Sequence, residues 1–163
     1  MIIRKKRYWA IWLAVFYAYF WLHELAGHYL TNIVSGMKMS QMYIDGLKIY
    51  NVVILPLKVT YTEIEPPRIS AFMGGAVAAF VLISLSIIFI LFYRKKKKER
   101  YFVLFSITLG IGCMGLIEVI VEPLFPTYHR SLTNALILLA VSISVPIIIN
   151  LIHYHKYKKE LIW

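Results

Sequence analysis

Four long apolar runs, separated by polar connections, constrain the fold of this chain more than any other feature. The runs cover about residues 8–33, 69–93, 101–122 and 131–153, and each approaches the roughly 20 residues that a helix needs to cross a bilayer. Of the 163 residues, 60% are hydrophobic, which is more than a water-soluble domain usually carries. We therefore predict an all-α polytopic membrane protein with four transmembrane helices, organised as a single membrane domain over residues 1–163.

The basic residues predict how these helices are oriented. Of the 18 Lys and Arg, 13 lie in the N-terminal cluster Arg4–Arg7, in the connector Arg94–Arg100 and in the tail after His153. Basic connections favour the cytoplasmic side, so we predict a multi-pass protein of the cell membrane with both termini cytoplasmic. Basic clusters at the ends of apolar helices are typical of contact with anionic lipid. The lipid bilayer is therefore an expected partner, and nucleic acid is not.

The connection between the first two predicted helices differs from the others. Residues 37–63 are rich in Ile, Val, Tyr and Thr, and they contain Asp45-Gly46, a turn signal for hairpins. We expect a small β-hairpin-like region here. It would serve as a lid or spacer, or it would offer an edge strand that pairs with an extended peptide.

A polar motif, His23-Glu24-Leu25-Ala26-Gly27-His28, lies towards the end of the first apolar run. Ionisable groups are costly within a membrane and mark functional sites. Two His that bracket a Glu are typical of helical zinc sites, where the imidazoles bind the ion and the Glu handles the proton of a bound water. The usual spacing is H-E-x-x-H, whereas this chain has H-E-x-x-x-H.

The extra residue in this motif predicts an irregular helix. In a regular α-helix, residues five apart are rotated by about 140° from each other, so His23 and His28 would not share a face. A one-residue π-bulge would bring them back towards one face, and Ala26-Gly27 is a permissive place for it. We therefore predict a bulge between His23 and His28. The alternative without a metal is that the two polar side chains form hydrogen bonds between helices.

Candidates for a third metal ligand can be compared by their depth, counted from the preceding basic cluster. His23 and His28 lie 16 and 21 residues after that cluster, Glu118 lies 18 and Glu122 lies 22. Glu118 is therefore the preferred ligand and Glu122 the alternative. Because the two glutamates are four residues apart, on one helical face, a centre built from Glu24, His28 and both glutamates is a further alternative.

Three more residues reach the same depth by this count. Gly74 and Gly75 lie 20 and 19 residues before Arg94, and Asn134 lies 22 residues before Lys156. Adjacent glycines permit close helix packing and would also let a substrate backbone approach a metal. Asn134 would donate a hydrogen bond to a developing oxyanion or to a neighbouring helix. We take all three as candidate substrate-binding residues.

The other histidines are weaker candidates. His129 lies in a short outer loop, and His153 and His155 lie in the basic tail on the opposite side from the motif. We expect these three side chains to be exposed or interfacial.

The stretch from His23 to about Phe80 resembles the site-2 proteases, a family of intramembrane zinc metalloproteases. HELAGHYLTNIVSGMKMSQMYIDG is similar to the His-Glu helix of that family and its following glycine and β-region, and ISAFMGGAVAAF is similar to its small-residue second motif. The resemblance implies Zn²⁺ and proteolysis within the membrane. The chain departs from the family in the extra motif residue, in lacking an Asp-Gly pair in the third apolar run, and in the predicted outward direction of the first helix. Glu118 is thus assigned by position and chemistry alone.

Three functions follow as hypotheses. The first is a membrane-embedded zinc metallopeptidase in which His23, His28 and Glu118 bind Zn²⁺, Glu24 is the catalytic base, and the substrate is a membrane-anchored or small exported peptide. The second is a non-catalytic metal-binding membrane protein, for example an accessory or immunity protein. The third, a metal transporter, is disfavoured because the polar groups gather at one depth and form no path across the membrane.

Overall fold

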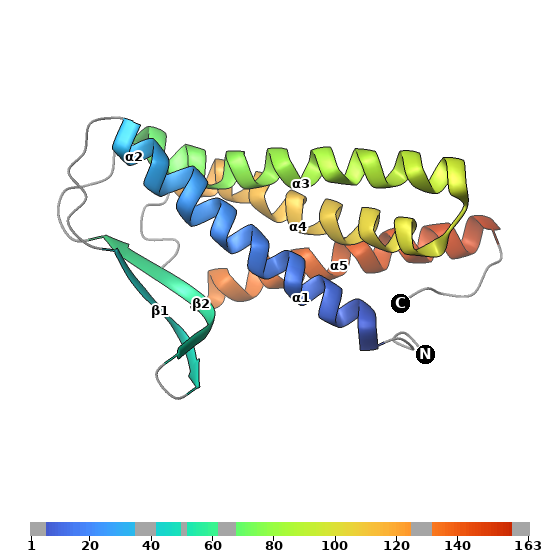
Figure 1. Cartoon of the computed structure of the whole chain (residues 1–163), viewed down its shortest axis with the longest axis horizontal. Helices are drawn as coiled ribbons and strands as arrows, with labels where there is room; N and C mark the ends of the chain where they lie inside the picture. Colours follow the sequence, from blue (N-terminus) through green and yellow to red (C-terminus); the bar gives the residue numbers. More distant parts are fainter. Residues whose placement is uncertain (1–5, 35–41, 50–51, 62–67, 125–131, 158–163) are drawn as a thin grey trace.

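The computed structural model describes residues 6–34, 42–49, 52–61, 68–124 and 132–157. The helices are α1 (Lys6–Trp21), the π-helix η1 (Leu22–Tyr29), α2 (Leu30–Val34), α3 (Arg68–Lys96), α4 (Glu99–Leu124) and α5 (Leu132–Tyr157). The first three follow one another without a break, so the described residues form four helical segments. The largest interface joins α3 to α4, and α1 crosses this pair obliquely (Figure 1).

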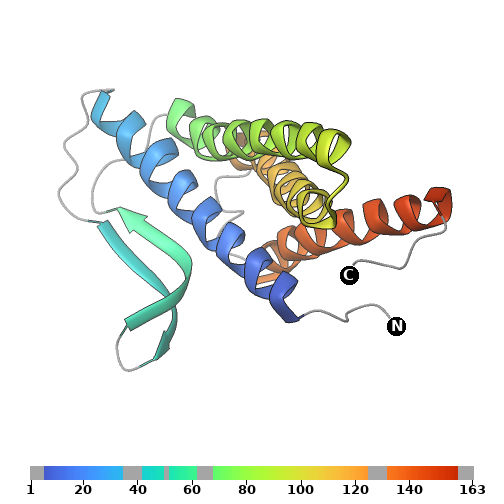
Figure 2. The same ribbon diagram turned by 45° about the vertical axis from the view of Figure 1, so that its right-hand side comes forward.

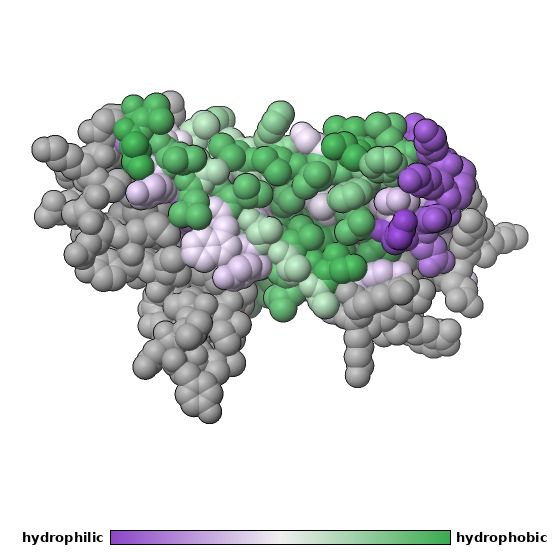
Figure 3. Space-filling view, viewed as in Figure 1, coloured by the Kyte–Doolittle hydropathy of each residue, from purple (hydrophilic) through white to green (hydrophobic). Residues whose placement is uncertain are grey.

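Three of the described helices are long and apolar enough to cross a membrane, over residues 72–96, 99–121 and 136–155. They coincide with three of the predicted spans, and the chain is a multi-pass helical membrane protein in contact with lipid. Figure 3 shows the hydrophobic surface that covers these helices, with hydrophilic residues gathered at one end. The fourth predicted span, 8–33, falls on α1, η1 and α2, and its position across the membrane stays a prediction.

The basic connector between α3 and α4 is a tight turn. Lys97 has a φ of 51°, and its N–H donates to the carbonyl of Tyr93 at 2.8 Å, as in left-handed C-terminal caps. The start of α1 and the end of α5 lie at the same end of the molecule as this turn (Figure 1). This arrangement agrees with four spans, but the crossing of the first helix and the cytoplasmic orientation of that end stay predictions.

The α4 helix is the central one. Of the three candidate spans it is the most enclosed, with 56% of its apolar window buried against 28% for each of the others. Val103, Ile107 and Ile111 are completely buried along it, while α3 and α5 pack against it. Residues of α4 are therefore well placed to meet side chains from the other helices.

A proline breaks the hydrogen bonding of α5 at its centre. Pro146 has no N–H, so the carbonyl of Ser142 loses its helical donor, and the indole N–H of Trp12 in α1 donates to that carbonyl at 3.2 Å. The Pro146 ring packs on Gly110 of α4, where an added Cβ would lie 2.5 Å from the Pro146 Cδ. This break therefore ties α5 to both α1 and α4.

Two strands, β1 (Met42–Ile49) and β2 (Val52–Tyr61), form an antiparallel pair. The turn predicted at Asp45-Gly46 is wrong, because both residues lie within β1, at a register shift where Gly46 pairs with Pro56. A glycine and a proline beside a register shift are typical of a bulge, where ladder hydrogen bonds are interrupted. Figures 1 and 2 show the two strands apart from the packed α3 and α4 helices.

Candidate metal centre

The His-Glu motif adopts a π-helix over all eight residues of η1, Leu22–Tyr29. In a π-helix each N–H bonds to the carbonyl five residues earlier, and the N–H of Leu30 accordingly donates to the carbonyl of Leu25. Residues five apart then fall on one face. The predicted bulge between His23 and His28 is confirmed, and it extends over the whole motif.

The two imidazoles of the motif converge. Nε2 of His23 and Nε2 of His28 are 2.9 Å apart, and both side chains are buried. One ligand atom from each of His23, Glu24 and His28 lies within 4.8 Å of the other two. Because Zn–N distances are about 2.0–2.1 Å, two nitrogens this close can share one ion. The three residues form a group with the right donors and spacing to hold a metal.

Gly74 provides the space beside these nitrogens. A Cβ added to Gly74 would lie 2.5 Å from Nε2 of His28 and 3.0 Å from Nε2 of His23. Both imidazoles therefore pack directly against the backbone of α3, which is possible only because residue 74 has no side chain. An added Cβ on Gly27 would in turn collide with the backbone of Gly74, so η1 and α3 touch backbone to backbone here. This cradle fits a metal ion held by the two imidazoles.

The neighbouring glycine, Gly75, faces a different helix. A Cβ there would lie 2.7 Å from the carbonyl oxygen of Gly115 and 3.1 Å from Cβ of Glu118. Gly75 and Gly115 thus let α3 and α4 approach closely, as small residues do in membrane helices. Their contact brings Glu118 to the level of the His residues, as the depth count predicted.

Glu118 contacts the far edge of the His23 ring. Its Oε2 lies 3.1 Å from Nδ1 of His23, whereas Nε2 of His23 faces His28. The hydroxyl of Tyr19 donates a hydrogen bond to the same Oε2. Tyr19 was not among the predicted site residues, although it precedes His23 by four residues, a spacing that places two helical side chains on one face.

Two predicted site residues cannot be located by their side chains. Glu122 lies one turn after Glu118 on α4, and Asn134 lies in the first turn of α5, but both side chains fall outside the described residues, as does His129. Their assigned roles therefore stay predictions. His155 is exposed, as expected.

His153 is buried, so the expectation of an exposed or interfacial side chain is wrong. Its Nε2 lies 2.9 Å from the hydroxyl of Tyr93, and its ring centroid lies 4.1 Å from that of Phe102. The reason is that α5 continues to Tyr157, which places His153 between the last turns of α3 and the first turn of α4. The basic residues nearby in sequence gave no sign of this packing.

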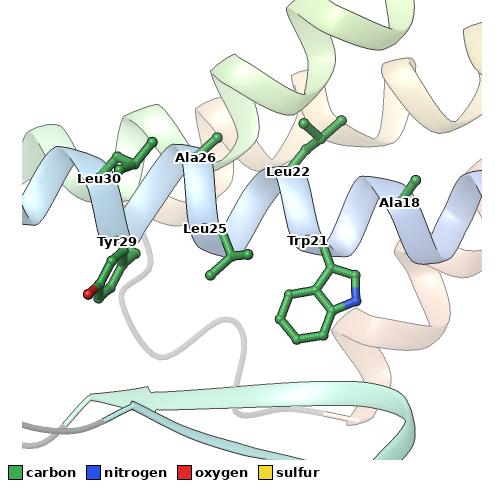
Figure 4. Close-up of a pocket in the computed structure, with 7 residues that line it drawn as sticks. All are labelled: Ala18, Trp21, Leu22, Leu25, Ala26, Tyr29 and Leu30. Carbon is green, nitrogen blue, oxygen red and sulfur yellow. The ribbon is translucent and has the colours of Figure 1, made fainter.

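An apolar groove runs along the helix that carries the motif (Figure 4). Its volume is about 530 Å³. In Figure 4 the side chains of Trp21, Leu25 and Tyr29 extend on the side where the strands are drawn. The groove is lined by Ala18, Trp21, Leu22, Leu25, Ala26, Tyr29 and Leu30. Neither His23 nor His28 belongs to it, so the groove and the metal-ligand group are separate features of one helix.

No family model, no curated protein and no solved structure matches this chain. Its class therefore rests on its own sequence and geometry. It is a multi-pass helical membrane protein with a buried His-Glu-His group that has the donors to bind a metal ion.

Proposed function

We propose that this protein is a membrane-embedded zinc metallopeptidase. The observation that carries the proposal is the convergence of Nε2 of His23 and Nε2 of His28 at 2.9 Å, with Glu24 in the same group. An irregular π-helix is required to bring the two His together, and π-helical segments occur frequently at functional sites. Buried ionisable groups in a lipid-spanning chain favour a functional role over a packing role.

Each residue of the group has a role in this proposal. His23 and His28 would hold the ion, and nitrogen and carboxylate ligands favour zinc. Bound zinc would polarise the scissile carbonyl and make water a stronger acid. Glu24 would accept a proton from the attacking water and pass it to the leaving amine. The depth count gave Glu118 as the third protein ligand and Glu122 as the alternative; because Oε2 of Glu118 contacts Nδ1 of His23 and not Nε2, we take Glu122 as the third ligand.

The expected substrate is a peptide segment that reaches the membrane, either membrane-anchored or small and exported. Gly74 would let the substrate backbone approach the ion, because it brings only backbone atoms next to the two imidazoles. Gly75 and Asn134 are the other proposed substrate-binding residues. Within the described residues β1 pairs with β2 alone, so each strand keeps one edge for an extended peptide.

Metal analysis of the purified protein tests the first half of the proposal. We expect about one zinc per chain in the wild type and none in His23→Ala or His28→Ala, because each variant removes one of only a few ligands. His155→Ala, which removes an exposed histidine from α5, is the matched control and should keep its zinc. A wild-type protein that binds no zinc would contradict the proposal.

Peptide release from membranes tests catalysis. Membranes that contain the wild type or Glu24→Gln are incubated, and the released peptides are compared by mass spectrometry. Glu24→Gln should keep its zinc and release none of the wild-type products, since the amide cannot accept the proton. Identical products from the two proteins would rule out the peptidase and favour the non-catalytic metal-binding protein.

A further inference from the structure

We propose that Tyr19 and Glu118 act together as positioning residues that hold His23 for the metal. This inference rests on the proposed metal site, and it assigns to Glu118 a role other than that of a ligand. It also adds Tyr19, which was not among the candidate residues chosen from the sequence. The two residues come from α1 and α4, so they reach His23 from its own helix and from the central helix of the fold.

Two buried polar side chains, Tyr19 and Glu118, meet at the Nδ1 edge of His23. Oε2 of Glu118 is 3.1 Å from Nδ1, and the hydroxyl oxygen of Tyr19 is 3.5 Å from the same nitrogen. The Tyr19 hydroxyl donates to Oε2 of Glu118. Tyr19, His23 and Glu118 are only 4%, 5% and 6% exposed, so water competes little for these contacts.

The contact at Nδ1 decides which nitrogen of His23 carries the proton. An ionised carboxylate only accepts hydrogen bonds, and a neutral imidazole has one donor and one acceptor nitrogen. Glu118 therefore favours the tautomer with hydrogen on Nδ1, which leaves the lone pair on Nε2. Nε2 is the nitrogen that faces His28 and the space beside Gly74. A carboxylate on the second nitrogen of a ligating His fixes its tautomer and orientation in many metal sites.

Tyr19 holds the carboxylate in turn. Its hydroxyl donates a hydrogen bond to Oε2, the oxygen that faces His23. Its ring packs on Gly115, where an added Cβ would lie 3.0 Å from Cε2 of the ring. Glu118 is three residues further along α4, so one turn of this helix fixes both the ring and the carboxylate. For Glu118 to bind an ion on the Nε2 side, it would have to give up both contacts. The third-ligand position then falls to another carboxylate.

The same protein offers a matched control. Tyr93 and His153 form a second buried Tyr–His contact, with 2.9 Å between the hydroxyl and Nε2. Tyr93→Phe removes the same atom as Tyr19→Phe, and it also takes a hydrogen-bond partner from a buried histidine. A general loss of packing would affect both variants alike, whereas a positioning role affects Tyr19→Phe alone.

Zinc affinity, measured by competition with a chelator, tests the inference. We expect Tyr19→Phe to bind zinc about 10-fold more weakly and Glu118→Gln about 10- to 100-fold more weakly, in the range for outer partners of ligating His. Tyr93→Phe should match the wild type. Because ligand number is unchanged, the visible absorption of the Co²⁺-substituted protein should keep its wild-type intensity and band positions in Tyr19→Phe and Glu118→Gln.

Each contrary result has a distinct meaning. If the wild type binds zinc and both variants bind it equally well, the positioning role is wrong and the metal site stands. If Glu118→Gln changes the Co²⁺ spectrum to that of a different coordination number, Glu118 is a ligand and the inference is wrong. If the wild type binds neither zinc nor Co²⁺, the proposed function fails, and this inference fails with it.

Discussion

Two histidines are buried at opposite ends of the α3–α4 pair, and they differ in what surrounds them. His23 lies beside Glu118 near the end of α4, and His153 lies beside Phe102 near its start. Both rings contact a tyrosine hydroxyl. Of these two histidines, however, only His23 belongs to the group of potential metal ligands found among the described residues.

The two histidines differ in what their Nε2 atoms face. Nε2 of His153 is taken by the Tyr93 hydroxyl, and aromatic rings pack around its imidazole. In His23 the polar partners gather at Nδ1, and Nε2 points at a second imidazole. Burial and a tyrosine partner are therefore not enough to define a metal site. A ring nitrogen that faces a second potential ligand is also needed.

The largest effect is expected for Gly74→Ala, because the added Cβ would collide with the imidazoles of His23 and His28. Overpacking a close contact costs on the order of 3 kcal/mol, so zinc affinity should fall at least about 100-fold. Gly112→Ala is the control, because its Cβ would meet a flexible side-chain atom, Cγ1 of Ile83, at 2.9 Å. Wild-type zinc affinity in Gly74→Ala would show that the ion binds elsewhere.

A smaller effect, on stability and not on zinc affinity, is expected at the end of the α3–α4 pair where His153 lies. His153→Ala should lower the free energy of unfolding by about 2 kcal/mol, because it leaves a cavity and removes the partner of the Tyr93 hydroxyl. Zinc affinity should not change. Thermal unfolding in detergent and a zinc titration measure the two quantities. Loss of zinc from this variant would break the distinction between the two histidines.

Deleting Ala26 tests whether the π-helix is needed only to bring His23 and His28 to one face. The deletion leaves H-E-x-x-H, whose two His share a face of a regular α-helix. Zinc affinity should stay within about 10-fold of the wild type, which is 1.4 kcal/mol or less. The control is the deletion of Leu13, which also removes one residue from the first helix but leaves the spacing of His23 and His28 unchanged. Complete loss of zinc from the Ala26 deletion would mean that the backbone of η1 contributes more than the spacing of its side chains.

The smallest effect is expected where α1 meets α5. Trp12→Phe should cost about 1 kcal/mol of stability, the usual net value of one hydrogen bond, and should leave zinc affinity unchanged because α5 supplies no described residue to the His group. In Pro146→Ala the cost should shrink, since the restored N–H at 146 would satisfy the carbonyl of Ser142. Equal costs in both backgrounds would show that the indole hydrogen bond adds nothing.

Much of the fold follows from simple features of the sequence. Apolar runs of about 20 residues gave the helices, because length and composition alone decide whether a segment suits a bilayer. The five-residue spacing of His23 and His28 required a bulge, because a regular α-helix would separate them. Counting from the basic clusters brought Glu118 and Gly74 to the depth of the motif, since parallel and antiparallel helices rise by the same amount per residue.

Other features depend on how each helix is rotated about its axis and how its side chains pack, and counting residues to estimate depth gives neither. Counting placed Glu118 level with His23 but not on its Nδ1 edge. Tyr19 lay within an aromatic run in which no single ring stood out. Asp45-Gly46 has the composition of a turn, yet pairing with β2 placed it inside a strand. His153 became buried because α5 runs further than its apolar stretch.

The close approach of Gly75 to Gly115 has a consequence for how the protein is made. Membrane proteins emerge from the ribosome helix by helix, and a nascent chain that ends before α4 already carries both imidazoles and Gly74. It lacks the carboxylate that orients His23, and it lacks the glycine against which α3 and Tyr19 pack. The site is thus completed only after α4 has been inserted.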